Sequence, residues 1–171
     1  CGKSTVVNLL TGALRPQSGR VTLGGASMES LSRESYYAHL AVVSCGSHIF
    51  NDTVRANFRL ANAAVTDEAI WAALETVNLA SFVRENGGLD NVIAEANLSG
   101  GQKQRLALAV NLTAERDIYI LDEATSNIDI ESEEIIMKAV AALAKEKAVI
   151  LISHRLANVV PAEKIYAMES G

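Results

Sequence analysis

The sequence predicts an α/β fold in which a mostly parallel sheet carries a helical insertion in the middle of the chain. Residues 117–123 (DIYILDE) and 148–153 (AVILIS) are continuous apolar runs of strand length, as in parallel strands that are buried on both faces. Helical patterns alternate with the strands, and a helix-rich block fills the middle of the chain. The 171 residues are enough for one domain with a substantial core.

The first part of the chain predicts a helix and two short strands. Residues 1–12 form a loop that runs directly into a helix, which ends near Gly12. A polar turn at residues 15–19 leads to a short strand at residues 20–25, which two glycines end. Residues 40–43 (LAVV) are a second apolar run of strand length.

Three longer helices and a final strand follow. Residues 66–77 begin with Thr66 as N-cap and acids in the first turn, and their apolar face consists of Ile70, Ala73, Leu74 and Val77. Residues 98–112 start a helix at two glycines. Residues 130–147 predict an amphipathic helix with a stripe of Ile136, Ala139, Val140 and Leu143. Residues 164–168 (KIYAM) predict the last strand.

Charge and cysteine content narrow the class of protein. The formal net charge of -5 gives no basic face for nucleic acid, so we expect no nucleic-acid partner. The two cysteines, Cys1 and Cys45, make no disulfide framework, which favours a reducing cytosol. Cys45 follows a short apolar run, and the residues alone leave three interpretations open: a nucleophile, a metal ligand, or the replacement of another residue.

GKST at residues 2–5 matches the second half of a phosphate-binding P-loop. In such a loop, glycines let backbone N–H groups wrap phosphate oxygens at a helix N-terminus. Lys3 would reach the β- and γ-phosphates, and the Ser4 hydroxyl would bind Mg²⁺. A glycine-led helix start with an exposed lysine is the alternative for this motif alone.

Two acids and a histidine follow the central strands. The apolar run before Asp122 would deliver it to the C-terminal edge of the sheet, where open α/β folds bind ligands. Asp122 would hold Mg²⁺ and Glu123 could polarise the attacking water; the alternative is a strand that ends in two surface acids. His154 directly follows residues 148–153, so we expect it at the same edge. His39 and His48 are expected to be surface or packing residues.

LSGGQKQR at residues 98–105 predicts a second anion-binding helix N-terminus. Ser99 and the amides of Gly100 and Gly101 could contact phosphate, and a packing helix would have no evident need for the flexibility of two glycines. The alternative is a glycine-rich N-cap.

Four motifs follow one another along the chain: GKST, LSGGQ, ILDEATSNID and LISHR. In their order and spacing, the chain resembles the ATP-binding cassette (ABC) ATPases over essentially its whole length. HIFNDTVRANF resembles the segment after the glutamine loop in exporters whose cassette is fused to a membrane domain. The resemblance implies a RecA-like P-loop NTPase core, formed by residues 1–45 and 114–171, and an inserted α-helical signature subdomain, residues 46–113.

The resemblance also implies the site and its partners. ATP and Mg²⁺ would be bound, with Gly2, Lys3, Ser4 and Thr5 on the nucleotide, Glu123 as catalytic base and His154 on the γ-phosphate. The signature residues would act on the ATP of a second cassette in a head-to-tail homo- or heterodimer, together with Asp129 of the D-loop; they are Ser99, Gly100, Gly101 and Gln102. A transmembrane domain, expected on the same polypeptide, would place the cassette at the cytoplasmic face of the plasma membrane.

Several positions depart from the family pattern. The chain begins inside the P-loop and stops before the usual last strands, so we expect one incomplete cassette, truncated at both ends. Val110 stands where an arginine is common, and the approach to the signature is short. Cys45 aligns with the glutamine of the glutamine loop, and a thiol is a soft ligand that suits Mg²⁺ poorly.

Three functions stay open on these grounds. The first is an ATP-hydrolysing exporter cassette. The second is a degenerate cassette that binds ATP and dimerises but hydrolyses little, which Cys45 favours. The third is a soluble ABC ATPase of chromosome-maintenance or translation type; the chain has none of the long heptad segments of the former.

Overall fold

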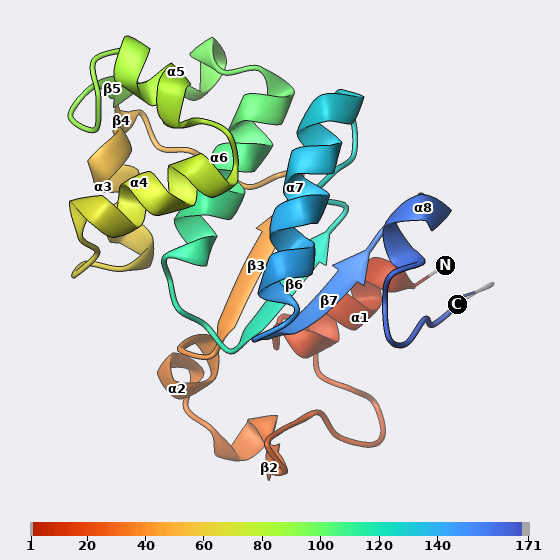
Figure 1. Ribbon diagram of the computed structural model, residues 1–171. Coiled ribbons are helices and arrows are strands. Elements are labelled where there is room, and N and C mark those ends of the chain that lie inside the picture. Colours follow the sequence, from red (N-terminus) through yellow and green to blue (C-terminus); the bar gives the residue numbers. More distant parts are fainter. Residues whose placement is uncertain (1, 169–171) are drawn as a thin grey trace.

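The computed structural model describes residues 2–168, and its centre is a parallel three-stranded sheet in the order β3-β6-β7 (Figure 1). These strands are β3 (Leu40–Ser44), β6 (Ile118–Asp122) and β7 (Ala148–Ile152). Ser44 is in register with Asp122, and Asp122 with Ile152. All three strands therefore end at one edge, and the predicted parallel sheet is confirmed.

The two faces of the sheet bury different elements, because successive side chains of a strand point to opposite faces. Ile120 of β6 packs with Val7 and Tyr36, which belong to α1 (Lys3–Leu10) and α2 (Arg33–Tyr37). Tyr119 and Leu121 belong to the larger cluster on the other face, with side chains of α7 (Ile130–Leu143). A strand buried on both faces explains the continuous apolar run in the sequence.

The connection from α1 to β3, residues 11–39, contains only short elements. The predicted strand at residues 20–25 is only β1 (Thr22–Leu23), which pairs antiparallel with β2 (Ala26–Ser27) across Gly24 and Gly25. Both glycines have a positive φ, 56° and 87°, as the tight turn requires. A 3₁₀ turn, η1 (Met28–Ser30), leads on to α2.

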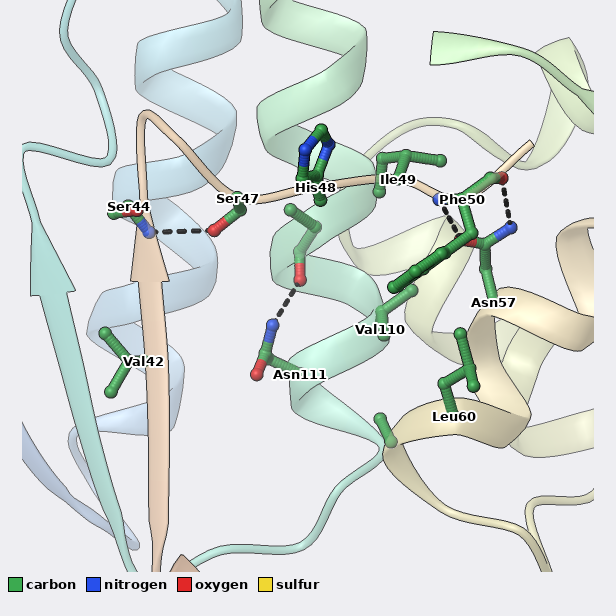
Figure 2. Close-up of a pocket in the computed structure, with 12 residues that line it drawn as sticks. Val42, Ser44, Ser47, His48, Ile49, Phe50, Asn57, Leu60, Val110 and Asn111 are labelled. Carbon is green, nitrogen blue, oxygen red and sulfur yellow. Dashed lines mark hydrogen bonds between the residues drawn. The ribbon is translucent and has the colours of Figure 1, made fainter. Parts of the chain in front are cut away.

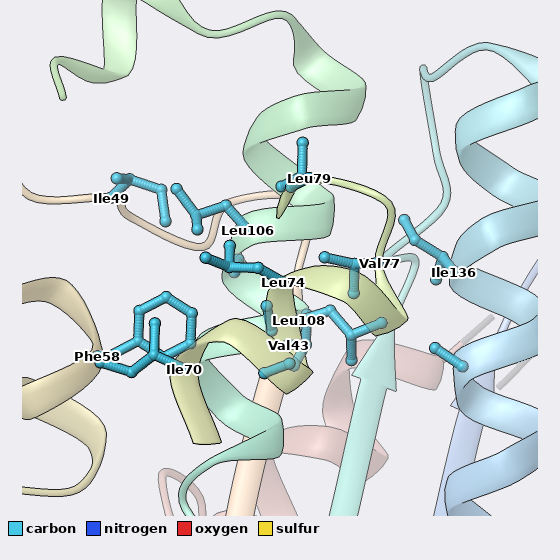
Figure 3. Packing of buried hydrophobic residues seen from close by; sticks show 14 of the residues in the cluster. Val43, Ile49, Phe58, Ile70, Leu74, Val77, Leu79, Leu106, Leu108 and Ile136 are labelled. Atoms are coloured by element: carbon cyan, nitrogen blue, oxygen red, sulfur yellow. The ribbon is translucent and has the colours of Figure 1, made fainter. Parts of the chain in front are cut away.

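The middle of the chain forms a helical block beside the sheet. It contains α3 (Val54–Ala61), α4 (Asp67–Thr76), α5 (Ala80–Glu85) and α6 (Gly100–Leu112), together with the hairpin of β4 (Asp52–Thr53) and β5 (Val92–Ile93) and the turn η2 (Glu95–Asn97). Thr66 accepts from the Ala69 amide as the predicted N-cap. All four predicted face residues of α4 are buried, and Figure 3 draws Ile70, Leu74 and Val77 packed with Leu108 of α6.

The last helix is α8 (Leu156–Val159), after β7. The strand predicted at residues 164–168 is wrong: the segment is irregular, Ile165 and Tyr166 are exposed, and it pairs with no strand in the described part of the chain. Its apolar residues match a strand pattern, but in the described part of the chain the segment does not pair with the outer strand β7. Among residues 2–168, no helix has both the length and the apolar character to cross a membrane.

Candidate functional site

The N-terminus of α1 is open for an anion. Gly2 precedes the helix with φ 82° and ψ 0°, a left-handed conformation that suits glycine, and no side chain caps the first turn. Ser4 and Thr5 are exposed there, and the first turn contains no acidic residue. The first N–H groups of a helix have no partner inside it, so this turn offers donors and a favourable dipole to a phosphate.

Asp122 and Glu123 stand at the C-terminal edge of the sheet. Asp122 is half-buried, and its pKa is raised by loss of solvation and by the charge of Glu123, while Lys3 acts to lower it. Glu123 continues the strand pairing by donating its N–H to the Ile152 carbonyl at 3.0 Å. Its φ of 52° lies in the left-handed region, which is costly for a residue with a side chain and is often found at functional sites.

Lys3, Glu123 and His154 meet at this edge. Nε2 of His154 lies 2.6 Å from Oε1 of Glu123. Nζ of Lys3 lies 2.9 Å from Nδ1 of the same ring and 3.0 Å from Nε2. A neutral imidazole satisfies both neighbours if Nε2–H donates to Glu123 and Nδ1 accepts from the lysine. The structure thus brings together residues from three motifs that lie far apart in the sequence.

Cys45 directly follows β3, beside this edge. Ser44 is in register with Asp122, so Cys45 and Glu123 each come directly after the end of their strand at the same edge. A turn in which the Ser47 amide donates to the Ser44 carbonyl at 3.0 Å holds the segment, and the thiol is exposed and not in a disulfide. Within residues 2–168, no group of three or more His, Cys, Asp or Glu side chains is arranged to hold a metal ion.

Ser99 caps the N-terminus of α6. Its hydroxyl accepts from the Gln102 amide at 3.1 Å, and the Gln102 side chain accepts from the Ser99 amide at 2.9 Å. This reciprocal pair is a capping box. It leaves the Ser99 hydroxyl proton and the amides of Gly100 and Gly101 as donors at the start of a helix.

Gly101 has a packing role that the sequence did not reveal. A Cβ at this position would lie 2.8 Å from Oδ2 of Asp129 and would overlap the Ser132 hydroxyl. Asp129 is the N-cap of α7 and accepts from the Ser132 amide at 2.8 Å. The expectation that a packing helix would not need this glycine is therefore wrong, because α6 and α7 approach too closely here for a side chain.

The signature residues form no bond with the sheet edge of their own chain. Across residues 2–168, the hydrogen bonds of the Ser99 and Gln102 side chains are those of the capping box. The Glu123 side chain contacts His154, and His154 also contacts Lys3. The sequence analysis also missed Glu133, which lies one turn before Ile136 on the apolar stripe of α7 and is buried. A charged residue on an apolar stripe is the signal that could have identified it.

A hollow of about 430 Å³ lies between β3, α3, α6 and the loop after Cys45 (Figure 2). Asn57 fixes the loop by accepting from the Phe50 amide at 2.8 Å and donating to the Phe50 carbonyl at 3.0 Å. A second, wider hollow of about 700 Å³ shares His48, Ile49 and Phe50 with the first. The rim includes exposed apolar side chains, with Phe50 59% and Leu60 66% exposed.

His39 and His48 both lie at the surface, as expected. His39 contacts Asp117 at 2.5 Å, at the opposite end of β6 from Asp122. His48 contacts Glu95 at 2.7 Å, and Glu95 also accepts from Lys103 of α6 at 2.5 Å. Through these two contacts, Glu95 links the loop after Cys45 to the signature helix α6. The sequence analysis did not single out Glu95.

Comparison with known proteins places the chain in a family. An uncharacterised ABC transporter ATP-binding protein of Haemophilus influenzae is 49% identical over 173 residues, which cover 100% of the chain and 31% of that protein. An ATP-dependent lipid A-core flippase of Haemophilus ducreyi is 40% identical over 174 residues, 99% of the chain and 30% of the flippase. The chain thus spans about a third of the length of these relatives.

A solved structure agrees. The structure of a bacterial Atm1-family ABC exporter with ATP bound matches with a TM-score of 0.84 and 32% identity, covering 92% of the chain and 28% of the exporter chain. This match confirms the predicted P-loop ATPase fold. The family model described as ABC transporter matches residues 1–126, well over half of the sequence, and the chain therefore belongs to the ABC transporter family.

Proposed function

We propose that the chain is the ATP-binding and ATP-hydrolysing domain of an exporter-type ABC transporter, which powers export of a substrate through a membrane-domain partner. The observation that carries this proposal is the meeting of Lys3, Glu123 and His154 at the sheet edge where β6 delivers Asp122. A lysine on a helix N-terminus, a carboxylate and a histidine within hydrogen-bond reach are the groups that phosphoryl transfer to water needs. The exporter relatives support the transport role.

Mg²⁺ fits the residues at this edge. The Ser4 hydroxyl and the Asp122 carboxylate are hard oxygen donors, and Mg²⁺ in such sites is held by one or two carboxylates together with substrate phosphates. Loss of solvation and the charge of Glu123 raise the pKa of Asp122, and the positive charge of a bound cation would act in the opposite direction. When bound, Mg²⁺ would neutralise phosphate charge.

Each protein group has a distinct part in hydrolysis. Gly2, Lys3, Ser4 and Thr5 bind the phosphates of ATP through the open helix N-terminus, and Lys3 exchanges its contact with His154 for the phosphates. Glu123 accepts a proton from the attacking water. His154 orients the Glu123 carboxylate through Nε2–H. To contact the γ-phosphate after Lys3 has left, Nδ1 must carry a proton that it donates to a phosphate oxygen.

A second cassette completes the site in this proposal. Ser99, Gly100, Gly101 and Gln102 form a second anion-binding helix N-terminus that is not bonded to the sheet edge of its own chain. A head-to-tail homo- or heterodimer would bring it to the ATP of the partner cassette, with Asp129 at the interface. Glu123 and His154 have side chains that are 35% and 67% exposed, so a partner surface can still cover them.

The membrane domain is proposed to dock at the two hollows beside the loop after Cys45. The exposed Phe50 and Leu60 give this surface an apolar rim at the junction of sheet and helical block. Residues 1–45 and 114–171 would form the core and residues 46–113 the signature subdomain that meets the partner. The cassette would lie at the cytoplasmic face of the plasma membrane.

The second candidate is a cassette that binds ATP and dimerises with little hydrolysis. The exposed Cys45 thiol favours it, because it stands at the sheet edge where the family has a glutamine. ATP turnover and ATP binding of the intact transporter, compared with Cys45→Gln, separate the two. Turnover in the parent supports the proposal, whereas binding without turnover that Cys45→Gln restores supports the second candidate.

A further inference from the structure

We propose that Glu133 is a positioning residue for His154: its buried carboxylate anchors the segment that carries the histidine, so that the ring stays against Glu123 and Lys3. The inference rests on the proposed ATP site but concerns a residue outside its motifs. Glu133 lies in the first turn of α7, and its side chain is only 10% exposed.

The Glu133 carboxylate has two partners, and both follow His154 in the sequence. The Arg155 guanidinium forms an ion pair with one oxygen, and Nδ2 of Asn158 donates to the other at 2.7 Å. The same Asn158 group lies 3.3 Å from the Thr125 hydroxyl, in the loop after Glu123. The buried carboxylate of Glu133 therefore links α7 to Arg155 and Asn158, which lie near the two ends of the segment after His154.

Apart from the contacts of His154 itself, few interactions within residues 2–168 hold this segment. α8 contains no buried residue, and Leu156 is 81% exposed. The Ser153 hydroxyl accepts from the Arg155 amide at 3.0 Å, which shapes the turn around His154 without tying it to another element. A network of buried charge and hydrogen bonds is strong when complete and costly to break, so Glu133 is the main anchor of residues 153–159 on α7.

This anchor matters for chemistry because His154 is itself exposed. Its contacts with Glu123 and Lys3 are at the surface, where water competes, and they depend on the ring being held in place. A displacement of about 1 Å can lower a rate by about 100-fold without contact between the altered residue and the substrate. Glu133 therefore affects the rate through His154.

The test uses the intact transporter with Glu133→Gln, in the parent and in a His154→Ala background. Glutamine keeps the volume and the acceptor for Asn158 but loses the charge that pairs with Arg155. Glu134→Gln is the matched control, since Glu134 is the next residue and is exposed. We expect Glu133→Gln to lower kcat by ~10- to 100-fold with little change in KM, and to have no further effect once His154 is alanine.

Hydrogen exchange provides a readout that does not need turnover. Amides of residues 153–160 should exchange faster in Glu133→Gln than in Glu134→Gln, while β7 is unchanged. If Glu133→Gln fails to fold, Arg155→Gln removes the same ion pair from its half-exposed end and must give the same fall in kcat.

Three results overturn the inference: unchanged kcat in an active parent, an equal fall in kcat when His154 is already alanine, or unchanged exchange at residues 153–160. A parent that binds ATP but does not hydrolyse it contradicts the proposed hydrolysis instead. The exchange comparison then decides alone whether Glu133 anchors the segment.

Discussion

Oε1 of Glu123 and Nε2 of His154 lie 2.6 Å apart, at the ends of two neighbouring parallel strands. The register pairs Asp122 with Ile152, so Glu123 comes one residue after the end of β6 and His154 two residues after the end of β7. Lys3 reaches the same ring from α1. The left-handed φ of Glu123, 52°, turns the chain directly after the strand. The proposed phosphate chemistry rests on this sheet edge, the left-handed Glu123 and the nearby helix N-terminus.

Gly101→Ala should destabilise the fold by about 1–3 kcal/mol, as overpacking does in a close contact. A Cβ there would lie 2.8 Å from Oδ2 of Asp129, so α6 and α7 would have to separate. Urea unfolding of the purified protein measures the change. Gly100→Ala is the control, because its Cβ would be 3.8 Å from the nearest atom, the Asn127 carbonyl oxygen. Equal stability of the two variants would contradict the packing role.

Asp122→Asn should stabilise the nucleotide-free protein at pH 7 and weaken its Mg²⁺-dependent ATP binding. The pKa of Asp122 is raised above its ordinary 3.8, so the unfolded chain releases this proton at a lower pH than the folded one. Stability is therefore lost as the pH rises through the window above 3.8 and stays lost at pH 7. Melting temperatures from pH 3 to pH 7 should show the variant's advantage grow with pH.

Asp117→Asn is the matched control, at the other end of the same strand. Its pKa is lowered, first by the hydrogen bond from His39, so Asp117 stabilises the fold above its ordinary pKa. The variant should be less stable than the parent at pH 7, opposite in sign to Asp122→Asn. The same sign for both would contradict the assigned electrostatics.

Glu95→Gln should loosen the loop after Cys45 from the signature helix. Contacts with Lys103 and His48 lower the pKa of Glu95 to about 2, from an ordinary 4.5. Its stabilisation is thus fully present above pH 4.5 and is lost as the pH falls toward 2. The melting temperatures of parent and variant should differ more at pH 7 than at pH 3, and residues 46–51 should exchange faster at pH 7. Identical exchange would remove Glu95 as a link between the two elements.

Local patterns in the sequence predicted much of the fold. Thr66 and the face of α4 could be predicted because an N-cap and a spacing of three and four residues need no knowledge of distant segments. The shared sheet edge of Asp122 and His154 could be predicted because each follows an apolar run typical of a parallel strand. The strand wrongly predicted at residues 164–168 had the right composition, but composition does not decide whether a segment pairs with an outer strand such as β7.

Features that depend on tertiary contacts could not be predicted from the sequence. Position 101 needs a glycine because α7, which begins far along the chain, packs against it. Glu133 is buried, and its carboxylate contacts its partners Arg155 and Asn158. The φ of Glu123 and its contact with His154 likewise depend on two strands being side by side. The motifs predict the reacting groups, whereas the residues proposed to hold them in place could be found only in the folded chain.

The most direct test of hydrolysis at this edge is ATP turnover and ATP-dependent dimerisation of the intact transporter against Glu123→Gln. The amide keeps the shape and the contact with His154 but cannot accept the proton of water. We expect turnover to fall by ~100-fold or more, with the ATP-bound dimer accumulating. Turnover of Glu123→Gln at the parent's rate would contradict the account.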